Sequence, residues 1–307
     1  MDINLADFYA RLGMIAMIIA LGFFLGKAKW ISSKTNGQIV NLLLMVFMPA
    51  ALFSAFPVDF SRNSLQMFLA GLAGGFLVMI SLVLVAKLVF NKRFYKEFRN
   101  ESQFAFIFNN ATFLGYPIIA TTFGAEGLVP YCGFIIAFNV ALFSYGVYLF
   151  KKRLSWKLVL DTILNPNIIA VVLGMIVFLF NISLPDFLRG GIELAGSAMT
   201  PLSLICIGYM LSNAVFKKLV RKWRLFLTAA VQLTLGPTLT FLLLSLFNFP
   251  IEVRIVCTLI QALPTATSLG LFAEKYGGDE TQSSELVVIS TLMSVITLPI
   301  IVLLFLT

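Results

Sequence analysis

The residues of this chain best suited to hold a ligand interrupt otherwise apolar sequence at two places. The first interruption, at 109–122, carries two amides, three threonines, a glycine and Pro117. The second, at 261–270, carries a glutamine, three hydroxyl side chains and Pro264. Side-chain amides, hydroxyls and free backbone N–H groups are hydrogen-bond donors that suit a carboxylate. We therefore predict that the two stretches together bind a small anion.

The prolines explain why both stretches should be broken helices. Proline removes one helical hydrogen bond and clashes with the carbonyl four residues back. In lipid, a carbonyl left unpaired costs several kcal/mol, so a broken backbone is tolerated only against protein or a water-filled cavity. Each break also exposes a helix N-terminus that carries a positive charge of about half an electron. Two such ends meeting in mid-membrane form an anion site that needs no lysine or arginine.

The predicted substrate-binding residues combine amides, hydroxyls and the backbone around the prolines. They are Asn109, Asn110, Thr112, Tyr116, Pro117, Gln261, Pro264, Thr265, Thr267 and Ser268. Four further residues are expected to line the cavity: Pro49, Asn139, Ser197 and Thr200. The alternative is that the three amides at 109, 110 and 261 only hold neighbouring helices together.

Other chemistry finds little support in the residue types. The chain has no histidine, which excludes histidine zinc sites, Ser-His triads and histidine proton relays. The three cysteines lie in apolar runs and are expected to be buried. We predict no catalytic residue, no metal ligand and no cofactor, so an enzyme is the least favoured class.

The composition predicts the elements that must position these stretches. Of the 307 residues, 60% are hydrophobic and only 12% are charged, whereas soluble domains are about one quarter charged. The chain is therefore an all-α polytopic membrane protein, with no solvated basic domain for nucleic acid. Ten transmembrane helices of roughly 20 residues fit its length. They are expected at 6–26, 36–55, 65–90, 102–123, 127–150, 158–181, 187–212, 223–247, 252–274 and 284–306.

The basic residues give the orientation of these helices. If both termini lie outside, eighteen of the 22 Lys and Arg residues fall on the cytoplasmic side, as the positive-inside rule requires. They cluster at 27–34, 87–99, 151–157 and 217–224, with Lys275 beyond them. The expected location is a cell membrane, with the bacterial inner membrane favoured.

The prolines also indicate an internal repeat. The basic cluster at 151–153 divides the chain into residues 1–150 and 151–307, each with five helices, so the halves have opposite orientations. Pro49 in the second helix matches Pro201 in the seventh, and Pro117 in the fourth matches Pro264 in the ninth. We therefore expect a 5+5 inverted repeat with crossed broken helices.

Several motifs in order resemble the auxin efflux carrier family, which includes the plant PIN auxin carriers and bacterial organic-anion permeases. The motifs are Asn110-Ala-Thr-Phe-Leu-Gly-Tyr-Pro117, Asn165-Pro166-Asn167, Ala262-Leu263-Pro264 with Phe272-Ala-Glu-Lys-Tyr276, and Ser290-Thr291-Leu292 with Leu298-Pro299. The second motif is also expected to cap the start of the sixth helix.

The resemblance implies a fold related to bile-acid symporters and NhaA-type exchangers. It implies a scaffold of helices 1, 2, 6 and 7, and a transport core of helices 3–5 and 8–10. The fourth and ninth helices would cross at Pro117 and Pro264, the core would move like an elevator, and the scaffold would form a homodimer. The implied substrates are carboxylates such as malate, malonate or indole acetate, bound by Asn110 and the backbone around both prolines. The chain lacks the long central loop of the plant carriers, so a compact bacterial carrier is expected.

The coupling ion stays open. None of the 14 acidic residues lies clearly at the middle of a predicted helix, where a proton relay or a charged sodium cage usually has one. Sodium held by carbonyls and hydroxyls remains an alternative, as in a sodium-coupled symporter of the bile-acid type. A membrane sensor or channel without coupled transport is the second alternative.

Overall fold

The structure is a computed structural model that describes residues 5–56, 61–91, 95, 98–152, 160, 163–213 and 222–305. Throughout these residues the regular elements are helices, and two short stretches form one isolated β-bridge. The helices are α1 Leu5–Lys27, α2 Ser33–Leu42, α3 Met48–Phe53, α4 Arg62–Val89, α5 Arg99–Ile107, α6 Tyr116–Ala141, α7 Val147–Lys151, α9 Pro166–Leu179, α10 Asp186–Ser197, α11 Met199–Ser212, α13 Trp223–Leu246, α14 Ile251–Gln261, α15 Ser268–Tyr276 and α16 Glu280–Phe305. Three π-helical turns join some of them: η1 Leu43–Phe47, η2 Ala111–Gly115 and η3 Leu142–Gly146.

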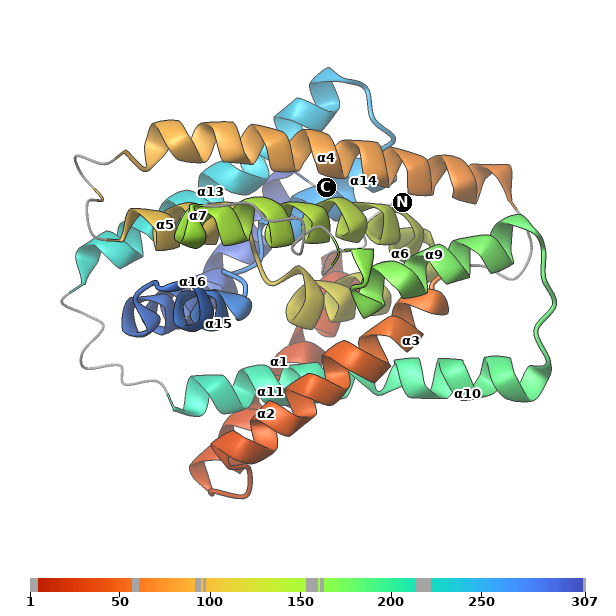
Figure 1. Ribbon diagram of the computed structural model, residues 1–307, viewed down its shortest axis with the longest axis horizontal. Helices are drawn as coiled ribbons and strands as arrows, with labels where there is room; N and C mark the ends of the chain where they lie inside the picture. Colours follow the sequence, from red (N-terminus) through yellow and green to blue (C-terminus); the bar gives the residue numbers. More distant parts are fainter. Residues whose placement is uncertain are drawn as a thin grey trace.

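The helices pack mainly within two groups. In the first, α1 packs along α11, and α3 packs against α9 and α10. In the second, α4 packs along α6, while α13 packs against α5, α14 and α16. Figure 1 shows α2, α10 and α11 along one side of the molecule and α4, α13 and α14 along the opposite side. Contacts between the groups are fewer and run mainly through α6 and η2 to α1, α9 and α11.

Glycines let the main helix pairs of both groups approach backbone to backbone. In the first group, a Cβ added at Gly22 or Gly208 would overlap main-chain atoms of the facing helix. In the second group, Gly71 of α4 and Gly133 of α6 meet in the same way. Small residues at such crossings are typical of membrane helices, where close packing replaces the hydrophobic effect as the driving force.

Seven helical runs in the described part of the chain are long and apolar enough to cross a membrane. They are 6–27, 33–53, 62–89, 111–151, 186–212, 223–246 and 280–305. Large apolar side chains such as Phe24, Leu88 and Phe187 are exposed on these surfaces, as expected for helices that face lipid. The chain is therefore an all-helical, multi-pass membrane protein.

The predicted count of ten helices differs from this count for three reasons. Most residues of the expected helices at 102–123 and 127–150 fall in one run of 41 residues, 111–151, in which Gly124 has non-helical φ and ψ angles. The expected ninth helix is divided into α14 and α15. The apolar part of the expected sixth helix is α9, which has only 14 residues, and other parts of its expected range lie outside the described residues. Parts of the basic clusters, at 92–94, 96–97, 153–159 and 214–221, also lie outside the described residues. The count of ten and the inverted repeat remain predictions.

Two glycines with positive φ lie just beyond the predicted ends of the fourth and ninth helices, at 123 and 274. Gly124 has a φ of 55° inside the long run, and Gly277 has a φ of 87° after α15. Residues with a Cβ rarely adopt this conformation, so glycine is the default choice. At Gly277 the left-handed residue is a regular helix end.

Candidate functional site

The two broken stretches lie side by side and are joined through their main chains. Asn110 donates its backbone N–H to the carbonyl of Pro264 at 2.7 Å, and Ala266 donates to the carbonyl of Phe108 at 2.9 Å. Between these bonds, Asn109 and Thr265 form an antiparallel bridge. The pairing replaces hydrogen bonds that each broken helix has lost, which an apolar membrane interior requires. We call this paired region, residues 108–110 and 264–266, the crossover.

The first break is not at Pro117, where a crossing was expected. The backbone leaves helical geometry at Phe108, with φ −112° and ψ 103°. Pro117 lies inside the helical run 111–151, directly after the π-helical turn η2, and Gly115 and Tyr116 before it keep helical φ and ψ. The π-helical turn changes the hydrogen-bond pattern at this point, with the N–H of Tyr116 bonded to the carbonyl of Ala111, and the helix continues past the proline. Pro264, in contrast, lies in the second break, as predicted.

Asn110 forms the start of the helical segment after the first break. Its Oδ1 accepts the backbone N–H of Phe113 at 3.2 Å, and its carbonyl accepts the N–H groups of Leu114 and Gly115. The side chain is 4% exposed. Asn110 is therefore a helix cap that also donates across the crossover, and this accounts for an asparagine inside an apolar stretch.

Asn109 and Gln261 pair through their side-chain amides. The Nδ2 of Asn109 donates to the Oε1 of Gln261 at 2.7 Å, and each residue is 1% exposed. The Oδ1 of Asn109 and the Nε2 of Gln261 have no protein partner. The pair thus brings together two of the predicted binding residues and leaves two polar atoms unsatisfied beside the crossover.

Thr265 is held by two residues that were not predicted to belong to the site. Its hydroxyl donates to the Oε1 of Gln232 at 2.8 Å, and its backbone N–H donates to the Oγ of Ser290 at 3.0 Å. The Nε2 of Gln232 then donates to the carbonyl of Leu263 at 3.1 Å. All these groups are buried. The sequence shows only a glutamine in the middle of an apolar helix, which does not by itself name the partners of Gln232.

Backbone donors remain free at the starts of the two helical segments that leave the crossover. Among the hydrogen bonds of the described residues, none is donated by the backbone N–H of Thr112, Thr267 or Ser268. All three residues are half-buried, whereas the crossover between them is buried. Free amides at helix starts, with their partial positive charge, are suited to an anion.

The remaining predicted residues are Tyr116, which packs near the start of α6, and the four expected to line the cavity. Tyr116 is 8% exposed and its ring packs edge-on against Tyr131, whose hydroxyl donates to the carbonyl of Ala111. The four residues expected to line a cavity make no hydrogen bond to the crossover among those of the described residues. They are Pro49, Asn139, Ser197 and Thr200, of which Asn139 bonds within its own helix and Ser197 is exposed.

Two surface hollows lie away from the crossover. One, of about 220 Å³, lies between α3, α9 and α10 and includes Ser54 and Arg189. The other, of about 380 Å³, includes Asn63, Glu126 and Glu252. Neither contains a predicted binding residue. The crossover residues 108–110 and 264–266 are themselves buried, so a ligand reaches their side chains only after a rearrangement.

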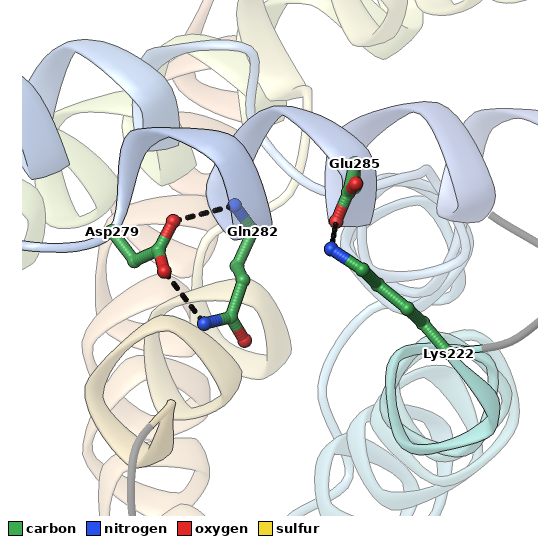
Figure 2. Close-up of polar contacts among 4 residues, drawn as sticks. All are labelled: Lys222, Asp279, Gln282 and Glu285. Carbon is green, nitrogen blue, oxygen red and sulfur yellow. Dashed lines mark hydrogen bonds and ion pairs between the residues drawn. The ribbon is translucent and has the colours of Figure 1, made fainter. Parts of the chain in front are cut away.

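A polar cluster connects several helices at one end of the second group (Figure 2). Asp279 accepts the backbone N–H and the side-chain Nε2 of Gln282 at the start of α16, while Lys222 pairs with Glu285. The backbone N–H of Asp279 donates to buried Glu101 of α5. The N–H of Gln282 lowers the pKa of the Asp279 carboxyl, because it stabilises the charged form.

Comparison with known proteins relates the chain to a family and to a relative. A family model described as "Membrane transport protein" matches residues 8–302. An uncharacterized transporter of Methanocaldococcus jannaschii is 24% identical over 297 residues, which cover 93% of this chain and 95% of that protein.

Proposed function

The chain belongs to the membrane transport protein family, in agreement with the resemblance of its motifs to the auxin efflux carriers, and we propose that it carries small organic anions across the cell membrane. The proposed substrates are carboxylates such as malate, malonate or auxin-like acids. The observation that carries this proposal is the main-chain pairing of Asn110 with Pro264, which brings two helix starts together.

In this proposal, backbone N–H groups bind the carboxylate and side chains contact the rest of the substrate. The free backbone N–H groups of Thr112, Thr267 and Ser268 would hold the carboxylate, because they lie at helix starts with partial positive charge. Asn109, Gln261 and the crossover backbone would contact the remainder of the substrate. Tyr116, with its ring beside η2, would close one side.

Movement of one helix group against the other is part of the proposal. The scaffold would be the group of α1–α3 and α9–α11, and the transport core the group of α4–α7 and α13–α16. The observed packing, which is mainly within each group, supports this division. The burial of Asn110 and Gln261 also favours it, because a substrate reaches them only after a rearrangement. An elevator-type movement of the core would expose the crossover to each side in turn.

We extend the proposal to the topology and the assembly. Ten crossings, arranged as two inverted halves at 1–150 and 151–307 with both termini outside, satisfy the charge distribution best. The scaffold would then form a homodimer.

Cysteine labelling tests the topology. Cysteines placed one at a time near residue 30 and near residue 248 should react with a membrane-impermeant maleimide from opposite sides of the membrane. Labelling of both from one side would contradict the topology.

Counterflow in proteoliposomes tests the function. Vesicles loaded with unlabelled malate, malonate or indole acetate should accumulate the labelled acid saturably, and Asn110→Ala should abolish accumulation. Asn213→Leu, which removes an exposed amide at the end of α11, is the control and should transport normally. Wild-type counterflow by Asn110→Ala would contradict the site.

Two further measurements test the alternative functions. Replacement of sodium by choline in the buffer tests the sodium-coupled symporter, and ohmic single-channel currents would favour a channel.

A further inference from the structure

The Asn109–Gln261 pair has a property that does not depend on how its amides are oriented. In the observed arrangement, the Nδ2 of Asn109 donates to the Oε1 of Gln261, which leaves an oxygen on Asn109 and an NH2 group on Gln261. Turning both amides reverses the donor and the acceptor, and again leaves one oxygen and one NH2 group. Turning only one would place two oxygens or two NH2 groups against each other. The pair therefore always offers one free acceptor and one free donor.

These two groups are buried, and burial makes them costly to leave unpaired. Both side chains are 1% exposed, and an unsatisfied buried polar group costs about 1–3 kcal/mol. The neighbouring network shows the contrast: both ends of the Gln232 side chain are bonded, to Thr265 and to the carbonyl of Leu263. Both ends of the Gln232 amide are hydrogen-bonded, whereas Asn109 and Gln261 each have one amide end bonded and the other without a protein partner.

A bare carboxylate does not suit this pair. A carboxylate has only acceptors, so it would accept from one amide and face the oxygen of the other. A hydroxyl group both donates and accepts, and it can satisfy both amides at once. The carboxylate has other donors nearby, at the free backbone N–H groups of Thr112, Thr267 and Ser268.

We propose that Asn109 and Gln261 recognise a hydroxyl group of the substrate, so that the carrier selects hydroxycarboxylates over the corresponding acids without a hydroxyl. This inference rests on the proposed function of the crossover and assigns two parts of the substrate to two different groups of the site. The backbone amides bind the charged group, and the side-chain pair binds the hydroxyl. A site built to hydrogen-bond a hydroxyl discriminates strongly against an analogue without it, because its buried groups then stay unpaired.

Two matched pairs of acids test the inference in the purified wild-type protein. Lactate is compared with propionate, and malate with succinate, by competition against labelled malate at pH 8, where carboxyl groups are ionised and cannot donate. Each hydroxy acid should bind at least about tenfold tighter than its partner, because the acid without a hydroxyl leaves both buried groups of the pair unpaired. Equal affinity within both pairs would overturn the inference and leave the proposed carboxylate carrier intact, because a buried water then satisfies the amides.

A double variant locates the selectivity. Asn109→Leu with Gln261→Met replaces both amides by apolar groups of similar shape, which is close to neutral for stability when both partners change together. This variant should bind both members of each pair within about twofold of each other, whereas Asn213→Leu should keep the tenfold ratio. A tenfold preference retained by the double variant would place the hydroxyl elsewhere. If no acid of the set competes or is transported, the proposed function fails and the inference fails with it. The wild-type comparison decides the matter even if the double variant does not fold.

Discussion

The backbone N–H of Asn110 and the carbonyl of Pro264 are 2.7 Å apart, although 153 residues separate them in the chain. This bond fixes the start of one helical segment to the break in another. Any change that lets either stretch return to continuous helix should open the bond. The site should therefore depend on the breaks themselves as much as on the side chains they carry.

The two prolines should differ in importance. Pro264→Ala restores an N–H inside the second break and lets α14 extend toward α15, so we expect counterflow to fall at least about tenfold, as for a loss of roughly 1.4 kcal/mol. Pro117→Ala changes a residue inside the helical run 111–151, where helical backbone already continues past the proline, so the break at Phe108 and the crossover bonds stay as they are. It should keep counterflow within about twofold. Equal losses in the two variants, at equal protein levels in the vesicles, would show that the location of the break does not matter.

Some of this site could be predicted from sequence, and the reasons differ from residue to residue. An amide and a proline inside an apolar run signal a broken helix, which identified Asn109, Asn110 and Pro264. Asn165 caps α9 as predicted, because its Oδ1 accepts the N–H of Asn167. The position of the first break was wrong, because a proline is compatible both with a break and with a π-helical turn inside a helical run.

Two other features depend on more than the local sequence. Gln232 looked like any polar residue in an apolar helix, since its partners Thr265 and Leu263 lie about thirty residues away. The helix count depends on where runs divide. The non-helical residue Gly124 lies between the predicted helices 102–123 and 127–150, as expected, but helical structure on both sides of it forms a run of 41 residues.

The network around Gln232 should contribute to stability before it contributes to transport. Gln232→Leu leaves the carbonyl of Leu263 without that donor and the hydroxyl of Thr265 without its acceptor, so we expect a loss of about 1–3 kcal/mol. The measurement is the melting temperature of the purified protein, which should fall by several degrees. Thr234→Val is the control, because Thr234 is exposed on the same helix and should change stability by less than about 0.5 kcal/mol. A Gln232→Leu protein that melts like wild type would remove the network from the account of the site.

The helix crossing at Gly133 should not tolerate a side chain. A Cβ added there would overlap the carbonyl of Phe68 and the backbone of Leu72, so Gly133→Ala forces α4 and α6 apart. We expect a loss of about 1–3 kcal/mol from overpacking. Gly13→Ala is the control, since nothing lies within 4 Å of its added Cβ and alanine favours a helix by about 0.5–1 kcal/mol over glycine. Similar melting temperatures for the two variants would disprove the close crossing.

The cap at Asp279 gives the protein a pH dependence of known sign. The Gln282 N–H lowers the pKa of Asp279 below its usual value of about 3.9. A lowered folded pKa means that the charged cap stabilises the fold above the unfolded pKa, and that this contribution is lost as pH falls through the folded value. Because Asp279 is exposed, Asp279→Ala should lower stability at pH 7 by only about 0.5 kcal/mol, with solvent screening included.

Melting curves between pH 7 and pH 3 measure this contribution. The difference between wild type and Asp279→Ala should shrink as pH falls below about 4, because protonation then removes the same interaction from the wild type. Glu274→Gln removes an exposed carboxylate from α15 that makes no hydrogen bond among the described residues, and its difference from wild type should stay small throughout. A difference for Asp279→Ala that grows on acidification would have the wrong sign for a lowered pKa, and would mean that the carboxylate does not cap α16.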